Sequence, residues 1–372
     1  MFKKILAGFI VMALAFTSVP VTSDAAVQVG DNLKLFGDFR MRVELEQRDY
    51  EAGSTATTDS RERPRMRARF GGTYQTSLPN VSFTFGMAGN GGMDTLAHGS
   101  SNFQVDAAQV NVGFADSGVF IFGQQGFPLW QQTEVYWDQD NSAEGYVAAY
   151  TASLGDAGSL TASAAYLYVT NQGWQGSWFD NDTLTAWQVT HKGSFNGAST
   201  TLAFAGIHAN DGADGTVFRP GGSTNTDATP EPSWYQASGQ IKMGVDDYKV
   251  LLGADYNFSD WTETGDDNDQ GYVLQARIGK GAYGVRYYYY DIEEASVPFH
   301  GTARLTQDNI SCSTWCTGVE AHRVQLSYKI SSDVNTHFKF TTSEGKTGNN
   351  FTNSETADRT ANRYQLDFNF KF

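Results

Sequence analysis

The chain has 372 residues, of which 26 are Lys or Arg and 41 are Asp or Glu, giving a formal net charge of −15. A mean hydropathy of −0.40 is too polar for a helical membrane protein, which needs runs of about 20 apolar residues. An aromatic content of 14% with 39 glycines is not typical of a disordered chain, and the acidic balance disfavours nucleic acid as a partner.

The first element in chain order is an export signal. Lys3 and Lys4 precede an apolar run over residues 5–16, and Ser23-Asp24-Ala25 supplies the cleavage site. This pattern predicts a secretory signal peptide over residues 1–25 and a mature domain over residues 26–372. An uncleaved N-terminal anchor is the alternative, but the apolar run is too short to span a bilayer.

Past residue 30, apolar and polar side chains alternate with a period of two. In residues 33–46, Leu35, Met41 and Val43 share one face, while Arg40 and Arg42 share the other. The same alternation recurs over residues 248–258 and 323–330. It predicts β-strands with one apolar and one polar face, so we expect an all-β protein.

The connectors between these strands alternate strictly between short and long. Seven are tight and rich in Gly, Asp, Asn and Ser, as turns require: 77–80, 115–118, 155–158, 193–197, 244–247, 279–282 and 331–333. Eight are long and polar: 49–60, 89–102, 126–142, 170–182, 210–232, 259–270, 293–318 and 344–360. Fifteen connectors join sixteen strands.

An even number of strands with short turns at one end and long loops at the other is typical of a transmembrane barrel. Such a barrel turns its apolar face toward lipid and keeps a polar lumen. A water-soluble β-sandwich is the alternative, but it rarely separates long and short loops to opposite ends. We therefore predict a sixteen-stranded antiparallel barrel in the outer membrane of a Gram-negative bacterium, with short periplasmic turns and long extracellular loops.

The last strand carries a resemblance to a known family. Tyr364, Phe368, Phe370 and the terminal Phe372 alternate with polar residues. This strand resembles the C-terminal assembly signal of Gram-negative outer-membrane proteins, which the barrel-assembly machinery recognises. With sixteen strands and this length, the mature chain resembles the trimeric general porin family. That resemblance implies a homotrimer in contact with outer-membrane lipid and lipopolysaccharide, with no cofactor.

Five arginines stand at every second position of one predicted strand: Arg61, Arg63, Arg65, Arg67 and Arg69. In a strand they project to one face. Each guanidinium would cost roughly 2–4 kcal/mol at the bilayer midplane, so they must face the lumen, as must Arg40 and Arg42 on the preceding strand. Further basic residues on inward positions are Lys249, Arg277, Arg286, Arg323, Lys329 and Lys339.

Two interpretations of this basic wall remain open. The arginines could attract anions and set a transverse field in the pore, because rings of like charge let channels discriminate between ions. Alternatively, they could only solvate the lumen and pair with Glu44 and Glu46. In both cases the acidity of the chain lies mostly in the loops.

The third long connector, residues 126–142, contains the sequence FPLWQQTEVYWDQD. By the porin resemblance it folds inward and narrows the barrel. Glu134, Asp138 and Asp140 then face the arginine wall across a constriction. Its aromatic residues would pack the loop on the wall, since they are unlikely in water. An ordinary extracellular loop that packs on itself is the alternative.

The sequence gives little indication of metal binding or catalysis. Cys312 and Cys316 are the only cysteines, and a pair in an exported chain predicts a disulfide rather than a metal site. Neither a zinc-protease motif nor a nucleophile-elbow motif occurs, so we expect no enzyme.

The predicted function is passive diffusion of small hydrophilic solutes and ions. A channel specific for an anionic solute and a non-conducting adhesion barrel are the alternatives.

Overall fold

The structure is a computed structural model that describes residues 26–50, 59–92, 103–136, 142–168, 183–210, 233–260, 269–293, 296–297, 318–346 and 359–372. Within these ranges, no helix is long and apolar enough to cross a membrane. The helical element there is a single 3-10 turn, Gly155–Ala157. The strands are β1 (Val27–Val29), β2 (Leu33–Tyr50), β3 (Asp59–Gln75), β4 (Val81–Gly92), β5 (Phe103–Phe114), β6 (Gly118–Gly126), β7 (Ser142–Ser153), β8 (Ser159–Tyr168), β9 (Thr183–Phe195), β10 (Ala198–Asn210), β11 (Ser233–Val245), β12 (Tyr248–Ser259), β13 (Gln270–Lys280), β14 (Tyr283–Ile292), β15 (Val319–Lys329), β16 (Val334–Gly345) and β17 (Arg359–Lys371).

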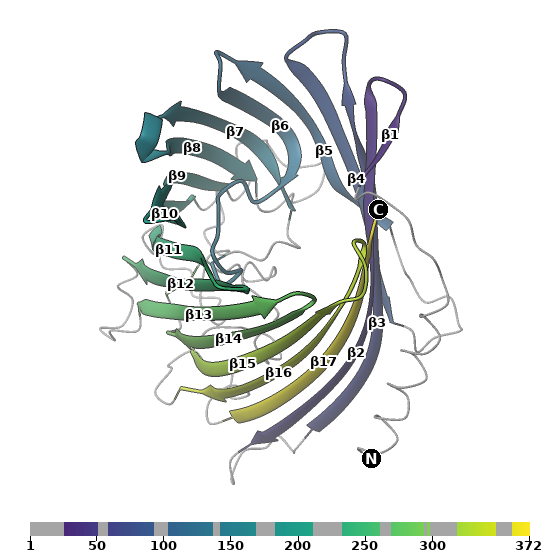
Figure 1. The fold of residues 1–372 in the computed structure, drawn as a ribbon, viewed down its shortest axis with the longest axis vertical. Helices are drawn as coiled ribbons and strands as arrows, with labels where there is room; N and C mark the ends of the chain where they lie inside the picture. The colour runs from purple at the N-terminus through teal and green to yellow at the C-terminus, as the bar shows by residue number, and fades with distance from the viewer. Residues whose placement is uncertain are drawn as a thin grey trace.

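Strands β2 to β17 form one closed antiparallel barrel (Figure 1). Each strand pairs with the next along the chain, and β17 closes the ring on β2. The prediction of sixteen strands is therefore confirmed. Because successive strands are antiparallel, the short connectors all lie at one end of the barrel, and the long connectors all leave from the other. We call these the short-turn end and the long-loop end.

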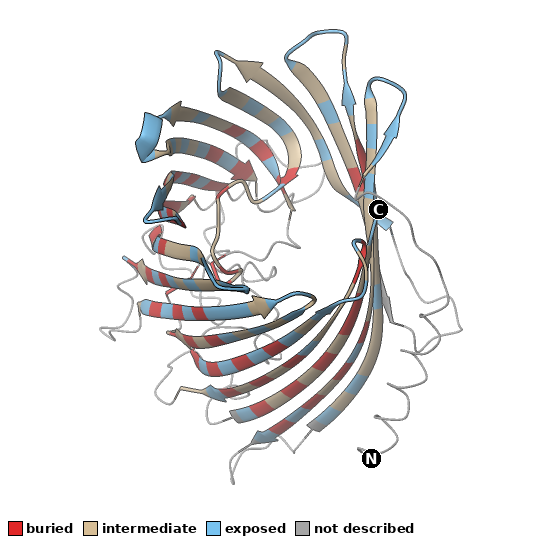
Figure 2. Cartoon of the chain, viewed as in Figure 1, coloured by how far each residue is buried: buried red, intermediate tan, exposed pale blue. Residues whose placement is uncertain are grey.

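The two faces of the wall differ as the alternation predicts. On β12, Leu252 and Tyr256 are exposed on the outer face, whereas Asp255 and Asn257 are buried on the inner face. Figure 2 shows the resulting stripes of buried and exposed residues along the strands. The barrel thus has an apolar outer surface and a largely polar lumen.

The short strand β1 was not expected from the sequence. It pairs with β2 in the register Val27↔Leu35 and Val29↔Leu33. The C-terminal strand occupies the rest of that edge, because Gly37 and Phe372 exchange backbone hydrogen bonds of 2.9 and 3.0 Å. β2 has 18 residues and β17 has 13, so β1 covers backbone that β17 does not reach. This removes an unpaired strand edge.

Strand β6 leads into the third long connector and contains a glycine in a backbone conformation that other residues avoid. Gly123 has a φ of 112°, and a Cβ atom there would lie 2.1 Å from the carbonyl oxygen of Ala108. Only glycine adopts this conformation without strain. Gly126, at the end of the same strand, has no heavy atom within 4 Å of such a Cβ.

We therefore expect Gly123→Ala to destabilise the folded barrel by about 1–3 kcal/mol. Gly126→Ala, the matched control, should change stability by less than about 0.5 kcal/mol. Urea titration of the barrel folded in lipid vesicles would measure both. Equal stability of the two variants would show that a side chain at position 123 is tolerated without strain.

Candidate functional site

The charged side chains of the lumen gather on β2, β3, β16 and β17, which we call the ionic wall. Its members are Asp38, Arg40, Arg42, Glu44, Glu46 and Arg48 on β2, Arg61, Arg63, Arg65, Arg67 and Arg69 on β3, Lys339 on β16, and Arg363, Asp367 and Lys371 on β17. The register places the charges of neighbouring strands directly opposite one another. Glu46 faces Arg61, Glu44 faces Arg63, and Asp38 faces Arg69.

Asp367 holds the centre of this wall together. Its carboxylate accepts hydrogen bonds of 2.6 and 3.1 Å from Arg42 and lies 2.8 Å from the Nζ atom of Lys339. The side chains of Asp367 and Arg42 are both 2% exposed. Buried charges are tolerated when they are paired and hydrogen-bonded, so this trio forms a fixed ionic group across three strands.

Glu44 makes a second ionic group one step closer to the long-loop end. Its carboxylate accepts hydrogen bonds of 2.8 Å from Arg363 and 2.7 Å from Gln365, both on β17. On the other side it accepts a hydrogen bond of 3.0 Å from Nε of Arg63 on β3. Glu44 therefore links the first, second and last strands of the ring.

Two further carboxylates pair with arginines toward the two ends of the ionic wall. Glu46 accepts hydrogen bonds of 2.6 Å from Arg48 and 3.2 Å from Arg61 near the long-loop end. Asp38 accepts a hydrogen bond of 2.8 Å from Arg69 near the short-turn end. The arginines at both ends of the β3 row thus contact acids of β2.

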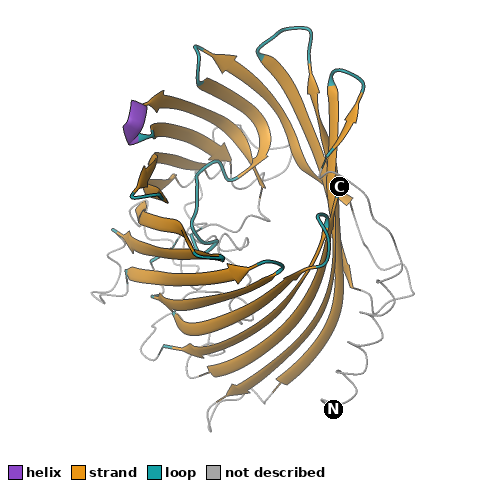
Figure 3. Cartoon of the chain, in the orientation of Figure 1, coloured by secondary structure: helices purple, strands orange, loops and turns teal. Residues whose placement is uncertain are grey.

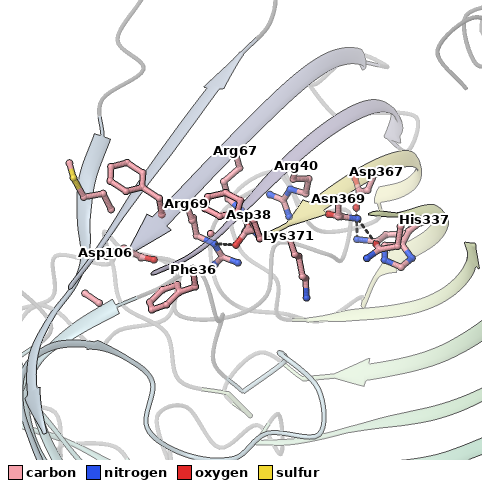
Figure 4. A pocket seen from close by; sticks show the side chains of 18 residues that line it. Phe36, Asp38, Arg40, Arg67, Arg69, Asp106, His337, Asp367, Asn369 and Lys371 are labelled. Carbon is pink, nitrogen blue, oxygen red and sulfur yellow. Dashed lines mark hydrogen bonds and ion pairs between the residues drawn. The ribbon is translucent and has the colours of Figure 1, made fainter. Parts of the chain in front are cut away.

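Between the ion pairs of Glu46 and those of Asp38, the ionic wall is rich in arginine. Arg40 lies opposite Arg67, and Arg42 lies opposite Arg65. The lumen here holds a cavity of about 590 Å³, shown in Figure 4 with Arg40, Arg67 and Arg69 around Asp38. Its basic lining residues are Arg40, Arg67, Arg69, Lys339 and Lys371, and its acidic lining residues are Asp38, Asp106 and Asp367. Cations outnumber carboxylates, so this part of the lumen attracts anions.

The third long connector enters the barrel. Its described residues 127–136, which we call the inner segment, lie inside the ring of strands (Figure 3). Trp130 exchanges two backbone hydrogen bonds of 2.8 Å with the side chain of Gln188 on β9. Thr133 donates a hydrogen bond of 2.5 Å to Asp255 on β12. The inner segment follows β6 in the chain but contacts β9 and β12, which are not neighbours of β6 in the barrel.

Tyr136 is the deepest anchor of the inner segment. Its side chain is 1% exposed, and its hydroxyl donates a hydrogen bond of 2.7 Å to the carbonyl oxygen of Trp234 on β11. Burial raises the pKa of Tyr136 well above its ordinary value, so the hydroxyl remains protonated and keeps donating at neutral pH.

The inner segment packs on an apolar patch of the lumen, which we call the apolar wall. It lies at the long-loop end of β7 to β15 and consists of Val147, Ala165, Leu167, Leu184, Ala186, Ala205, Ile207, Ala209, Trp234, Val273, Tyr288, Tyr290, Ile292, Val319 and Ala321. Leu129, Val135 and Tyr136 of the inner segment are buried against it. Burial of apolar area therefore holds the segment in place, on the side of the lumen away from the ionic wall.

Comparison with known proteins identifies this architecture. The sequence matches no family model, and no curated protein matches it. Several solved structures nevertheless match over almost the whole chain. OmpF of Salmonella typhi, solved as a complex with daunomycin, is 12% identical with a TM-score of 0.56 and covers 93% of this chain and 100% of its own. OprB of Pseudomonas putida is 11% identical with a TM-score of 0.59 and covers 92% and 94%. A loop L8 deletion variant of OmpT of Vibrio cholerae is 12% identical with a TM-score of 0.51 and covers 94% and 100%. The chain has the porin fold.

In this porin fold the residues predicted from sequence take different positions. The arginines at 40, 42, 61, 63, 65, 67 and 69 all lie on the inner face. Glu134 lies within electrostatic reach of Tyr290 on β14 and Arg323 on β15. Asp138, Asp140, Cys312 and Cys316 lie outside the described residues, as does the predicted signal peptide over residues 1–25.

The C-terminal residues predicted as an assembly signal lie on the outer face of β17. The ring of Phe370 lies 6.1 Å from that of Phe39, and the ring of Tyr364 lies 4.9 Å from that of Phe340. Phe368 is buried, whereas Phe372 is exposed. These aromatic contacts join the last strand of the porin fold to both neighbouring strands.

Two features of the lumen escaped the sequence analysis. The pairing of Asp367 with Arg42 was not predicted, because those residues are 325 positions apart. The apolar wall was missed because inward positions were expected to be polar. A usable signal was present, since Leu184 and Ala186 alternate with Trp187 and Val189, which makes both faces of β9 apolar.

Proposed function

We propose that the protein forms an aqueous channel through which small hydrophilic solutes and ions diffuse passively across the outer membrane. The observation that carries this proposal is the charged inner wall on one side of the lumen, with the inner segment fixed on the other. The arginines of β3 are only partly buried, and lumenal charges of one sign are how channels select ions. The channel has an anion preference, because cations outnumber carboxylates in the central cavity.

We also propose the following features, which the porin fold and the sequence support. Residues 1–25 direct export and are then removed, and the C-terminal strand ending at Phe372 is recognised by the assembly machinery. The mature protein, residues 26–372, assembles as a homotrimer in contact with outer-membrane lipid and lipopolysaccharide. Glu134, Asp138 and Asp140 contribute negative charge to the constricted side of the pore. Cys312 and Cys316 form a disulfide in an extracellular loop. The chain acts as a channel without a cofactor, not as an enzyme.

Single-channel recording in planar bilayers tests this function. The purified barrel should give discrete conductance steps that rise linearly with voltage at low voltage. A protein that inserts into the bilayer but never conducts would contradict the proposal and favour the adhesion barrel instead. Heat-dependent electrophoretic mobility of the unboiled protein would test the trimer.

Charge selectivity depends on the centre of the ionic wall. We expect the double variant Arg65→Gln/Arg67→Gln to shift the zero-current potential in a KCl gradient toward cation selectivity, because two lumenal positive charges are lost. The matched control is Lys280→Gln, which removes a 54%-exposed lysine at the short-turn end on the outer face of β13. An unchanged potential in the double variant would mean that the arginines have a structural role only.

A second candidate function is a channel with a binding site for an anionic solute. It is favoured by the cavity of about 590 Å³, in which Arg40, Arg67 and Arg69 converge. A general diffusion channel should conduct equally in the presence of inorganic phosphate and of a neutral sugar. Blockade of the current by low concentrations of phosphate, but not by the sugar, would favour the binding channel.

A further inference from the structure

A group of basic side chains on the lumenal face of β11 to β14 is separate from the ionic wall. Its members, which we call the basic cluster, are Lys242 on β11, Lys249 on β12, Arg277 on β13 and Arg286 on β14. The register brings them together, because Lys242 and Arg277 both lie opposite Leu251, and Arg286 lies opposite Arg277. Leu251 and Lys249 lie four and six residues from the lumenal Asp255, so the cluster faces the lumen.

The protein does not neutralise this cluster. In the part of the chain that the structure describes, none of its four side chains forms an ion pair. The lumenal positions of β11 to β14 between the short turns and Asp255 carry no carboxylate. The nearest acids in sequence are Asp246 and Asp247 in the turn after β11, and Asp247 lies 3.3 Å from Lys280 of the outer face. The charge of the cluster is therefore left for a solute to balance.

Two of the positive charges oppose each other directly. Arg277 and Arg286 are cross-strand partners, which places their Cβ atoms about 4.5–5.5 Å apart, and the two groups lie within electrostatic reach of each other. Arg286 donates a hydrogen bond of 2.7 Å to the hydroxyl of Tyr288, which orients the guanidinium without cancelling its charge. Like charges directly opposite each other destabilise a sheet. A carboxylate bound between them removes the repulsion and matches the fork of guanidinium donors.

The centre of the cluster is apolar. Leu251 is half-buried and lies between Lys242 and Arg277, whose strands are about 10 Å apart. The next lumenal positions toward the short-turn end on β11, β13 and β14 are Gly244, Gly279 and Gly284. None of these glycines carries a side chain, and a Cβ atom at Gly244 would have no heavy atom within 4 Å. The cluster thus has two basic ends with an apolar floor between them and open space beside it.

We propose that the basic cluster binds a dicarboxylate whose two carboxylates are joined by a short hydrocarbon chain. One carboxylate lies between Arg277 and Arg286, the other is held by Lys242 and Lys249, and the hydrocarbon chain lies on Leu251. A monocarboxylate would leave one basic end uncompensated, and a hydroxylated chain would lose the gain from covering an apolar side chain. The inference rests on the proposed channel only in that the solute must reach the lumen.

This site differs from the cavity of the ionic wall in how its cations are paired. In that cavity Arg67 and Arg69 contact Asp38, and Lys339 contacts Asp367. An anion that binds there competes with carboxylates of the protein. The basic cluster has no such carboxylates among the described residues, so an added dicarboxylate binds without displacing a protein acid.

Calorimetric titration of the folded barrel in detergent with succinate tests this site. Butyrate has the same carbon chain with one carboxylate, and tartrate has the same chain and charge with hydroxyl groups on it. The wild-type protein should bind succinate at least tenfold more tightly than butyrate, and more tightly than tartrate. The double variant Arg277→Gln/Arg286→Gln should lower the succinate affinity at least tenfold. The matched control, Lys280→Gln, removes an exposed lysine of the outer face of β13 and should leave the affinity unchanged.

Thermal unfolding gives a second readout. The double variant loses a like-charge repulsion, so without ligand it should unfold at or above the wild-type temperature. Succinate should raise the unfolding temperature of the wild type, because it binds only the folded state, but not that of the variant. If the double variant does not fold, Lys242→Gln/Lys249→Gln provides the same comparison at the other end of the site.

The proposal is overturned if the wild type does not bind succinate, if it binds butyrate or tartrate equally well, or if the double variant keeps the wild-type affinity. These measurements need no conductance, so their failure leaves the proposed channel untouched. A barrel that binds succinate but never conducts would contradict the channel and leave this site standing.

Discussion

Replacing Asp367 with asparagine should destabilise the folded barrel by about 3–5 kcal/mol, the cost of breaking a buried ion pair from one side. Its carboxylate is the shared acid of Arg42 and Lys339, and all three side chains are largely buried. Removing it leaves two desolvated cations beside each other. Urea titration of the barrel in lipid vesicles would measure the loss. Adding Lys339→Met should recover part of it, because one uncompensated cation is then removed.

The control for this experiment is Asp247→Asn. That carboxylate is 78% exposed and lies 3.3 Å from Lys280 in a short turn, so the pair is worth at most about 1 kcal/mol. If Asp367→Asn were no more destabilising than Asp247→Asn, lumenal water would be solvating Arg42 and Lys339. The ionic wall would then contribute little to the strength of the seam between β17 and β2.

Truncating Tyr136 to alanine should release the inner segment and increase the single-channel conductance. The loss of a fully buried aromatic ring costs about 3–5 kcal/mol, and each 1.4 kcal/mol is a factor of about ten in an equilibrium. The docked population should therefore fall by about two orders of magnitude or more relative to the undocked one. Single-channel recording in symmetric KCl would show larger steps, greater current noise, or both.

Tyr136→Phe is the matched control, because it keeps the ring and removes only the hydrogen bond to Trp234. That bond is worth about 1 kcal/mol, so the segment should stay docked and the conductance should remain close to that of the wild type. A Tyr136→Ala channel with wild-type conductance would show that the contacts of Trp130 and Thr133 hold the segment without this anchor.

Much of the barrel was predictable from local sequence. Alternation over residues 33–46, 248–258 and 323–330 assigned the faces of β2, β12 and β15, and all three agree with the structure. The tight turns could be predicted because glycine, asparagine and aspartate adopt backbone conformations that other residues avoid. Asn196 and Asp246, for example, have positive φ angles in two of these turns.

The candidate site was only partly predictable. The five alternating arginines could be placed in the lumen, because the lipid-facing side of a strand cannot hold five charged side chains. The pairing of these arginines with particular acids could not be derived, because it depends on strand register and on closure of the ring. The inward fold of the third long connector was predicted, but the apolar patch on which it packs was missed, since Leu184, Ile207 and Trp234 occupy inward positions that the alternation rule assigns to polar residues.

Local sequence was therefore enough to predict the strand number, the order of long and short connectors, and which side chains share a face. These properties follow from a two-residue period and from turn chemistry, both of which act within a few residues. Which charges pair, and which wall residues the inner segment contacts, depends on the folded barrel. Arg42 and Asp367 are 325 positions apart, and Thr133 and Asp255 are 122 apart. Such contacts exist only because the barrel closes, and no local pattern encodes them.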